Sequence, residues 1–144
     1  MNTVEQFMGT GVQTLTADDT LADAVGLMEK YGCYHIPVVN TANELQGLVS
    51  NRDVLQALPS SLAAEAADPD PAQVLIHHFM RREVITVNPD TELQQAAMFM
   101  RNARIGCLPV VDGKVLVGII TDTDFINIAV ELLEQSGDLE PMAL

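Results

Sequence analysis

The sequence predicts a mixed fold of helices and strands, built from two copies of one unit of about sixty residues. When the chain is shifted by 72 positions, residues 7–39 align with residues 79–111 without a gap, and 11 of the 33 aligned pairs are identical. Ordinary composition would give about two identities by chance. A shift of 71 then aligns residues 47–53 with residues 118–124. Because an open solenoid needs about three repeats, we expect the two copies to pair face to face about a pseudo-twofold axis.

Each copy is expected to begin with a short strand and a helix. The apolar segments 12–15 and 84–87 have the length and composition of strands, and acid-containing helix start signals follow them at 18–20 and 89–91. In both copies apolar residues then recur at i, i+3, i+4 and i+7, which forms one helix face. These residues are Leu21, Ala24, Val25 and Met28, and Leu93, Ala96, Ala97 and Met100. We interpret the methionines among them as core residues.

Each copy then continues with two strands and a closing helix. The strands are predicted by apolar runs at 36–39 and 45–49, and at 108–111 and 115–120. Asp112-Gly113 is typical of a hairpin turn because both residues tolerate a positive φ. The closing helices are expected over 51–58 and 122–134. A further helix is expected at 72–80, mirroring residues 4–8.

These elements define the organisation that we predict along the chain. The first repeat occupies residues 1–58 and the second residues 72–135. Residues 59–71 are rich in Pro, Ser, Ala and Asp, which is typical of an exposed linker. Residues 136–144 are expected to form a flexible tail.

Composition and charge limit the classes of partner. The chain has 144 residues, of which 48% are apolar, as expected of a globular protein. Its formal charge of −13 leaves no broad basic face for nucleic acid. No apolar run approaches the roughly 20 residues of a membrane-spanning helix, and the N-terminus lacks a secretion pattern. We therefore expect a cytoplasmic protein without membrane contact, with Cys33 and Cys107 as free buried thiols.

One motif, Gly-apolar-apolar-Ser/Thr-x-x-Asp, occurs once in each copy at a predicted strand-to-helix junction. It contains Ser50 and Asp53 in the first copy and Thr121 and Asp124 in the second. In one interpretation the hydroxyl caps the helix and the aspartate completes a capping box. In the other, the carboxylate accepts hydrogen bonds from ribose hydroxyls beside a helix N-terminus that can take phosphate. The residues alone leave both interpretations open.

The sequence offers no catalytic or metal-binding motif. His77 and His78 are adjacent, and adjacent side chains on a helix point about 100° apart, so with His35 they do not predict a metal site. No P-loop, dinucleotide-binding glycine pattern or Gly-x-Ser-x-Gly elbow occurs. We therefore expect neither an enzyme nor a metal protein.

Two further segments, 34–39 and 106–111, end in Pro-Val-Val, and each precedes the Gly-x-x-Ser/Thr-x-x-Asp motif of its copy. This doubled pattern resembles a tandem pair of cystathionine-β-synthase (CBS) domains, also called a Bateman module, over nearly the whole chain. The resemblance implies an α+β fold of two β-α-β-β-α units packed through their sheets, with two clefts for adenosine-containing ligands. No segment is left for a catalytic domain, so the chain looks like a stand-alone regulatory module.

The resemblance also implies which residues form the clefts. They are the ribose-binding aspartates Asp53 and Asp124, their hydroxyl partners Ser50 and Thr121, the base-contacting Thr14 and Thr86, the main chain of His35, Ile36, Cys107 and Leu108, and the phosphate-facing Arg52.

The two copies differ where a phosphate would be held. Arg52 of the first copy is replaced by Thr123 in the second, and His35 by Cys107. Guanidinium groups suit phosphate oxygens, so our hypothesis is that the cleft built on the first copy takes the more highly charged ligand. Three other arginines are candidates to supplement phosphate binding: Arg81, Arg82 and Arg104.

The predicted function is that of a non-enzymatic sensor that requires no cofactor. Its regulatory ligand would be AMP, ADP, ATP or S-adenosylmethionine, and binding would shift the population of two arrangements of the copies. We expect a homodimer whose target is another, unidentified protein with a basic face. The alternative is a structural module for dimerisation or protein docking, in which the nucleotide clefts are vestigial.

Overall fold

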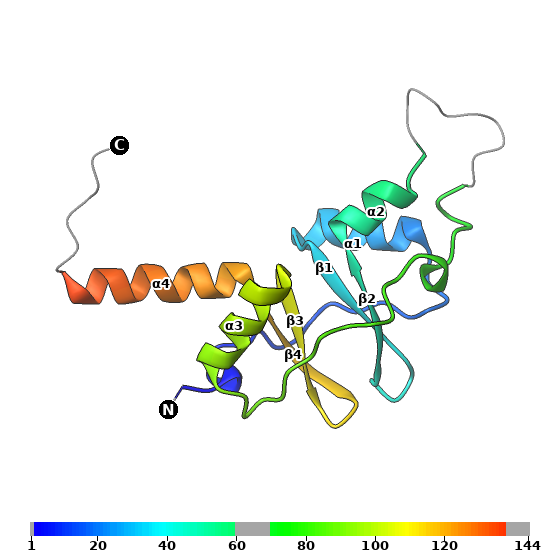
Figure 1. Ribbon diagram of the computed structural model, residues 1–144. Helices are drawn as coiled ribbons and strands as arrows, with labels where there is room; N and C mark the ends of the chain where they lie inside the picture. Colours follow the sequence, from blue (N-terminus) through cyan, green and yellow to red (C-terminus); the bar gives the residue numbers. More distant parts are fainter. Residues whose placement is uncertain (1, 60–69, 138–144) are drawn as a thin grey trace, which may run out of the picture.

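A computed structural model describes residues 2–59 and 70–137, which form two repeats of one architecture lying side by side (Figure 1). The helices and strands are, in order, α1 (Leu21–Tyr31), β1 (His35–Val39), β2 (Leu45–Ser50), α2 (Asn51–Ala57), α3 (Leu93–Ala103), β3 (Cys107–Asp112), β4 (Val115–Thr121) and α4 (Asp122–Ser136). Strands β1 and β2 form one antiparallel pair, and β3 and β4 form another. The predicted α+β fold of two repeats is therefore confirmed. Most of the predicted linker (60–69) and tail (138–144) lies outside the described residues.

The first helix of each repeat buries the apolar face that the sequence predicts. In α1 the buried residues are Leu21, Ala24 and Met28, and in α3 they are Leu93, Ala96 and Met100. Helix α1 begins at a capping box between Thr20 and Asp23 and ends at Gly32, whose φ is 64°. Helix α3 ends in the same left-handed conformation at Arg104, whose φ is 54°. The core methionines are thus confirmed.

The segments 12–15 and 84–87, predicted as strands, each make only one parallel bridge with their own repeat. Leu15 pairs with Val38, and Val87 pairs with Val110. The prediction of full strands was wrong because the chain pairs first with the sheet of the other repeat, at Gly9 or Arg81, and reaches the sheet of its own repeat six residues later, at this single bridge.

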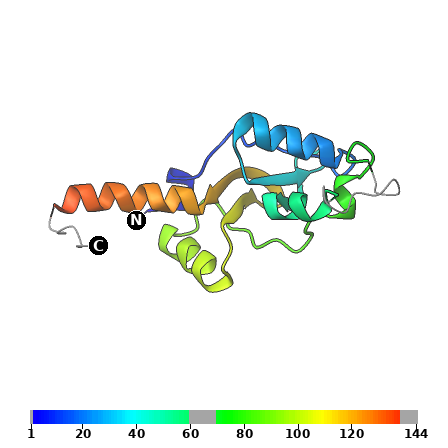
Figure 2. The same cartoon turned by 90° about the horizontal axis from the view of Figure 1, so that it is seen from above.

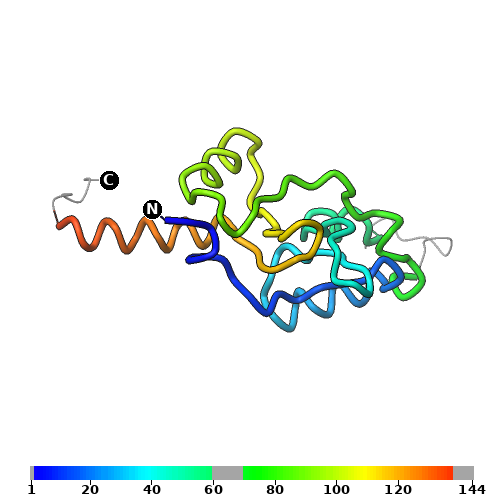
Figure 3. Tube along the Cα trace, turned by 90° about the horizontal axis from the view of Figure 1, so that it is seen from below, coloured from blue at the N-terminus to red at the C-terminus, as the bar shows by residue number. Residues whose placement is uncertain are grey.

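The start of each repeat completes the outer edge of the other repeat's hairpin. Gly9 and Ile119 exchange two backbone hydrogen bonds of 2.8 and 3.0 Å, and Arg81 and Leu48 exchange two of 2.9 Å. Figure 3 follows the N-terminal segment from its position beside α4 across to α1. Each sheet therefore contains backbone from both repeats.

The cores are exchanged in the same way. Val4, in the 3-10 helix η1 (Val4–Gln6), is fully buried in the core of the second repeat. Ile76, in the 3-10 helix η2 (Ile76–His78), is fully buried in the core of the first. The predicted helix at 72–80 was wrong apart from this single turn. Around it the backbone bonds to residues 19–21 instead: the Leu21 amide donates to the Val74 carbonyl and the Ile76 amide to the Asp19 carbonyl.

The helices cover the sheets unequally. Helix α2 packs beside α1 on the first repeat, whereas α4 projects beyond the body of the molecule (Figures 1 and 2). None of the residues of α4 is fully buried. Within the described residues, no helix combines the length and apolarity needed to cross a membrane.

Two glycines allow the exchanged segments to pass close to the hairpins. A Cβ at Gly118 would lie 2.8 Å from the Gly9 carbonyl oxygen, and a Cβ at Gly47 would lie 2.6 Å from the Arg81 carbonyl oxygen. Gly118→Ala should therefore destabilise the protein by about 1–3 kcal/mol, the usual effect of overpacking a filled interior. Urea unfolding of the variant measures this change.

Gly26→Ala is the matched control because Gly26 is exposed in α1, and a Cβ at this position would meet no atom within 4 Å. There the substitution should stabilise the protein by about 0.5–1 kcal/mol through helix propensity. Equal effects of the two substitutions would show that the close backbone approach at Gly118 carries no cost.

Candidate ligand-binding clefts

In each repeat a capping box lies at the junction between the second strand of the hairpin and the closing helix. The Asp53 amide donates to Ser50 Oγ, and Asp53 Oδ2 accepts from the Ser50 amide at 2.9 Å and from Ser50 Oγ at 2.8 Å. In the second repeat Asp124 Oδ2 accepts from the Thr121 amide at 2.8 Å and from Thr121 Oγ1 at 3.3 Å. The capping interpretation of the motif is confirmed, and such a cap typically stabilises a helix by about 1 kcal/mol.

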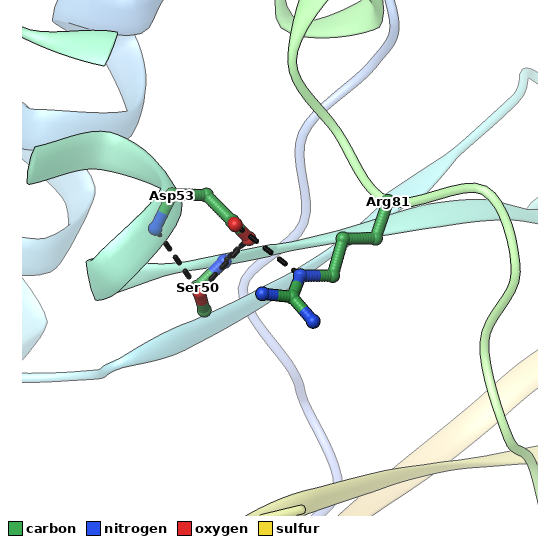
Figure 4. A network of polar contacts seen from close by, with 3 residues as sticks. All are labelled: Ser50, Asp53 and Arg81. Atoms are coloured by element: carbon green, nitrogen blue, oxygen red, sulfur yellow. Dashed lines mark hydrogen bonds and ion pairs between the residues drawn. The ribbon is translucent and has the colours of Figure 1, made fainter. Parts of the chain in front are cut away.

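The two carboxylates differ in their second oxygen. Asp53 is buried, and its Oδ1 accepts a hydrogen bond of 3.2 Å from Arg81 Nε, which reaches across from the start of the second repeat (Figure 4). Asp124 Oδ1 accepts no hydrogen bond from the described part of the chain. Asp53 is therefore tied both to its own helix and to the other repeat, whereas Asp124 is hydrogen-bonded only at the start of its own helix among the described residues.

The first cleft, here called cleft 1, has a volume of about 380 Å³. It lies at the junction of β2 and α2, and its wall is completed by the segment that crosses from the second repeat. The lining residues are 34–35, 48, 50–52, 81, 83–85 and 104–107.

The second cleft, here called cleft 2, has a volume of about 760 Å³. It lies at the junction of β4 and α4, and the N-terminal segment crosses over it. The lining residues are 9–10, 12–13, 32–35, 119 and 121–123.

The clefts occupy equivalent places in the two repeats. Ser50 of cleft 1 corresponds to Thr121 of cleft 2, and the segment 83–85 of cleft 1 corresponds to 11–13, of which 12–13 line cleft 2. Both clefts contain residues of both repeats. Tyr34 and His35 line the two clefts at once and so form a wall between them.

The predicted site residues fall into three groups. Those that line a cleft are His35, Ser50, Arg52, Cys107 and Thr121. The two aspartates lie one step behind the lining, hydrogen-bonded to the lining hydroxyls. The residues that are absent from both linings are Thr14, Ile36, Thr86 and Leu108. Ile36 and Leu108 are fully buried in the two cores.

Sequence reasoning missed several residues that line the clefts. Val12, Gln13, Val84 and Ile85 line the clefts although only the threonines that follow them were expected to do so. Tyr34 was also missed, although it precedes His35 directly. The repeat alignment is the feature that identifies them, because each of these positions is paired with a lining position in the other copy.

The candidate arginines separate clearly. Arg81 and Arg104 belong to the second repeat yet line cleft 1 together with Arg52. Arg82 is exposed, lines neither cleft, and donates from its guanidinium to the His77 carbonyl.

Burial controls the titration of the two groups that begin β1 and β3. Burial lowers the pKa of His35 below its usual 6.5 despite the opposing charges of Asp122 and Asp53, so the imidazole is neutral at pH 7. Burial, with Asp122 and Asp124 nearby, raises the pKa of Cys107 to about 12. Its thiol is therefore protonated at neutral pH and is a poor nucleophile.

Within residues 2–59 and 70–137, no three His, Cys, Asp or Glu side chains converge to hold a metal ion.

The family model of the CBS domain matches residues 4–60 and, a second time, residues 76–131. The chain belongs to the CBS domain family. A CBS domain-containing protein of Dictyostelium discoideum is 27% identical, and the match covers 91% of this chain and 93% of the relative. The homoserine O-acetyltransferase of Methanohalophilus mahii is 32% identical over 83% of this chain, but the match covers only 23% of that enzyme.

Solved structures share the arrangement of this CBS pair. The AcuB protein of Vibrio cholerae is 42% identical, with a TM-score of 0.80 and coverage of 98% and 99% of the two chains. The CBS pair of protein MJ0100, in complex with 5′-methylthioadenosine and S-adenosyl-L-methionine, is 25% identical, with a TM-score of 0.75 and coverage of 89% and 99%. CBSX2 in complex with AMP is 24% identical, with a TM-score of 0.78 and coverage of 92% and 98%, a likeness of fold.

Proposed function

We propose that this CBS pair is a non-enzymatic regulatory module that binds adenosine-containing ligands, AMP, ADP, ATP or S-adenosylmethionine, in clefts 1 and 2. The observation that carries the proposal is the pair of equivalent clefts, each with a Ser/Thr hydroxyl in its lining and a carboxylate directly behind it. The complexes of MJ0100 with methylthioadenosine and S-adenosylmethionine, and of CBSX2 with AMP, support this ligand class.

In this proposal the carboxylates recognise the sugar. Asp124 Oδ1 accepts a ribose hydroxyl while Oδ2 continues to cap α4. In cleft 1 the same role of Asp53 Oδ1 is shared with Arg81 Nε, so the ligand and the arginine meet at one carboxylate. The segments before Thr14 and Thr86 also line the clefts, and their apolar Val12, Val84 and Ile85 suit the flat base.

The regulatory step follows from the composition of the clefts. Because each cleft contains residues of both repeats, a bound ligand contacts both and favours the arrangement in which both sets of contacts form. A ligand moves such an equilibrium only through its difference in affinity for the two arrangements. The signal that a target protein receives is then the relative orientation of the repeats.

Thermal unfolding of the chain with AMP, ATP and S-adenosylmethionine tests the ligand class. A ligand present at 100 times its Kd should add about 2.7 kcal/mol to the free energy of unfolding and raise Tm accordingly.

Asp124→Asn retains an oxygen for the cap but replaces the free carboxylate oxygen, so it should weaken binding in cleft 2 about tenfold.

Asp23→Asn is the matched control, because Asp23 caps α1 in the same way but lies outside both clefts. It should leave ligand affinity unchanged. If no adenosine compound raises Tm, the adenosine-binding proposal fails and the structural alternative, a dimerisation or docking module with vestigial clefts, takes its place.

We also propose that the module is a homodimer formed through α4. Ile126, Val130 and Leu133 are 61%, 47% and 50% exposed and fall on one face of the helix at i, i+4 and i+7. Beside them, α4, α3 and the N-terminal segment form a groove of about 550 Å³ whose lining includes Phe7, Leu93 and Phe125. An exposed apolar stripe of this kind marks an interaction surface.

The variant Ile126→Gln with Leu133→Gln should convert the dimer to a monomer, which sedimentation equilibrium measures. Both side chains are exposed, so circular dichroism should show an unchanged fold. Val115→Gln, which changes an equally apolar but separate exposed position at the hairpin end of β4, should leave the dimer intact. A wild-type chain that sediments as a monomer would contradict the dimer.

A further inference from the structure

We infer that cleft 1 recognises the diphosphate or triphosphate group of its ligand, through Arg52, Arg81 and Arg104. This inference rests on the proposed adenosine-binding function and adds to it the ligand class of one cleft: nucleoside di- and triphosphates in preference to nucleosides.

The two clefts have equivalent positions but opposite charge. Cleft 1 is lined by three arginines and one acid, Glu83. At the positions of Arg52, Arg81 and Arg104, the second cleft has Thr123, Gly9 and Gly32. Among the described residues, the lining of cleft 2 includes no lysine or arginine, and Asp122 stands where cleft 1 has the neutral Asn51. The fold is the same in both places, so the arginines are not required to build it.

The concentration of basic side chains is unusual for this composition. The chain carries 20 acids and only 7 lysines and arginines, and three of those seven line cleft 1. All three arginines are solvent-exposed, so their guanidinium groups are accessible to a ligand from solvent. Because the overall field of a protein with a charge of −13 repels anions, local guanidinium groups are needed to hold a phosphate chain.

Arg104 occupies a backbone conformation that favours glycine. Its φ is 54°, and the equivalent Gly32 has a φ of 64°. A side chain in this left-handed region costs free energy relative to glycine. A positive charge does interact favourably with the C-terminus of α3, but Arg101 in the last turn already supplies one. The arginine at this position is explained by its place at the wall of cleft 1.

Arg81 is oriented for the same role. Its Nε is held by Asp53 Oδ1, while its two Nη groups make no hydrogen bond to the described residues (Figure 4). This arrangement fixes the direction of the guanidinium plane and leaves its outer N–H groups for phosphate oxygens.

The three arginines come from both repeats. Arg52 lies in α2 of the first repeat. Arg81 and Arg104 lie in the second repeat, six residues before Val87, which pairs with Val110, and three residues before β3, respectively. A phosphate chain that contacts all three therefore links the repeats, whereas a nucleoside without phosphates cannot make these contacts. The count of phosphates in the ligand would then set how strongly cleft 1 holds the repeats together.

Isothermal titration of the full chain with ADP, adenosine and inorganic pyrophosphate, all at one ionic strength, tests the inference. ADP should bind at least about tenfold more tightly than adenosine, since charged hydrogen bonds to phosphate are the strong ones. Pyrophosphate should compete with ADP for cleft 1, which separates recognition of the phosphate chain from recognition of the nucleoside.

Two variants take their residues from the other repeat and so preserve the fold. Arg104→Gly installs the glycine of position 32 and relieves the left-handed strain, and Arg52→Thr installs the residue of position 123. Each should weaken ADP binding about tenfold and leave adenosine binding unchanged. Arg101→Ala is the control, because Arg101 is exposed on α3 and lines neither cleft; it should not change ADP affinity.

The outcomes separate the two proposals. Equal affinities for ADP and adenosine, or an equal loss in the Arg101→Ala variant, would overturn the phosphate selectivity while the adenosine-binding function stands. Binding of pyrophosphate that depends on Arg52 and Arg104, without binding of any adenosine compound, would support the phosphate site and overturn the adenosine function. Absence of binding by all three compounds would overturn the phosphate selectivity, and failure of AMP, ATP and S-adenosylmethionine to raise Tm as well would overturn the adenosine function.

Discussion

Neither hairpin of this protein has a complete sheet edge or a complete core of its own. The backbone of Gly9 completes the edge of β4, and the backbone of Arg81 completes the edge of β2, each through two hydrogen bonds. An isolated two-stranded hairpin is marginally stable in water, and an unpaired edge invites association. Val4 and Ile76 are also buried in the opposite repeats, so each repeat completes the core of the other. The exchanged segments thus determine how the two repeats are joined.

This exchange also forms the two clefts in which we propose that a ligand binds. The segments that cross between the repeats pass over the strand-to-helix junctions, and the space left between them is cleft 1 on one side and cleft 2 on the other. The capping boxes of α2 and α4 hold the Ser/Thr hydroxyls in the cleft lining and the carboxylates behind them. A structural role and a binding role for the motif are therefore compatible, because one carboxylate oxygen serves the helix while the other faces Arg81 or remains available.

Local patterns in the sequence predicted the local parts of the structure. The apolar stripes of α1 and α3, the two hairpins and the capping boxes at Ser50 and Thr121 depend on neighbouring residues, and all were found. The short strands at 12–15 and 84–87 and the helix at 72–80 were wrong because their backbone groups pair with distant segments. The repeat alignment identified equivalent residues but not which repeat they would face. Arg81 and Arg104, which lie in the sequence of the second repeat, consequently line the cleft of the first.

In the proposed mode of binding, one ligand contacts both repeats. Hydrogen–deuterium exchange of the full chain, with and without saturating ADP, measures this because it reports the protection of each segment separately. Amides of residues 50–53 in the first repeat and 81–85 in the second should become protected together, at the same ADP concentration. Protection confined to a single repeat, or to the groove between α3 and α4, would contradict it.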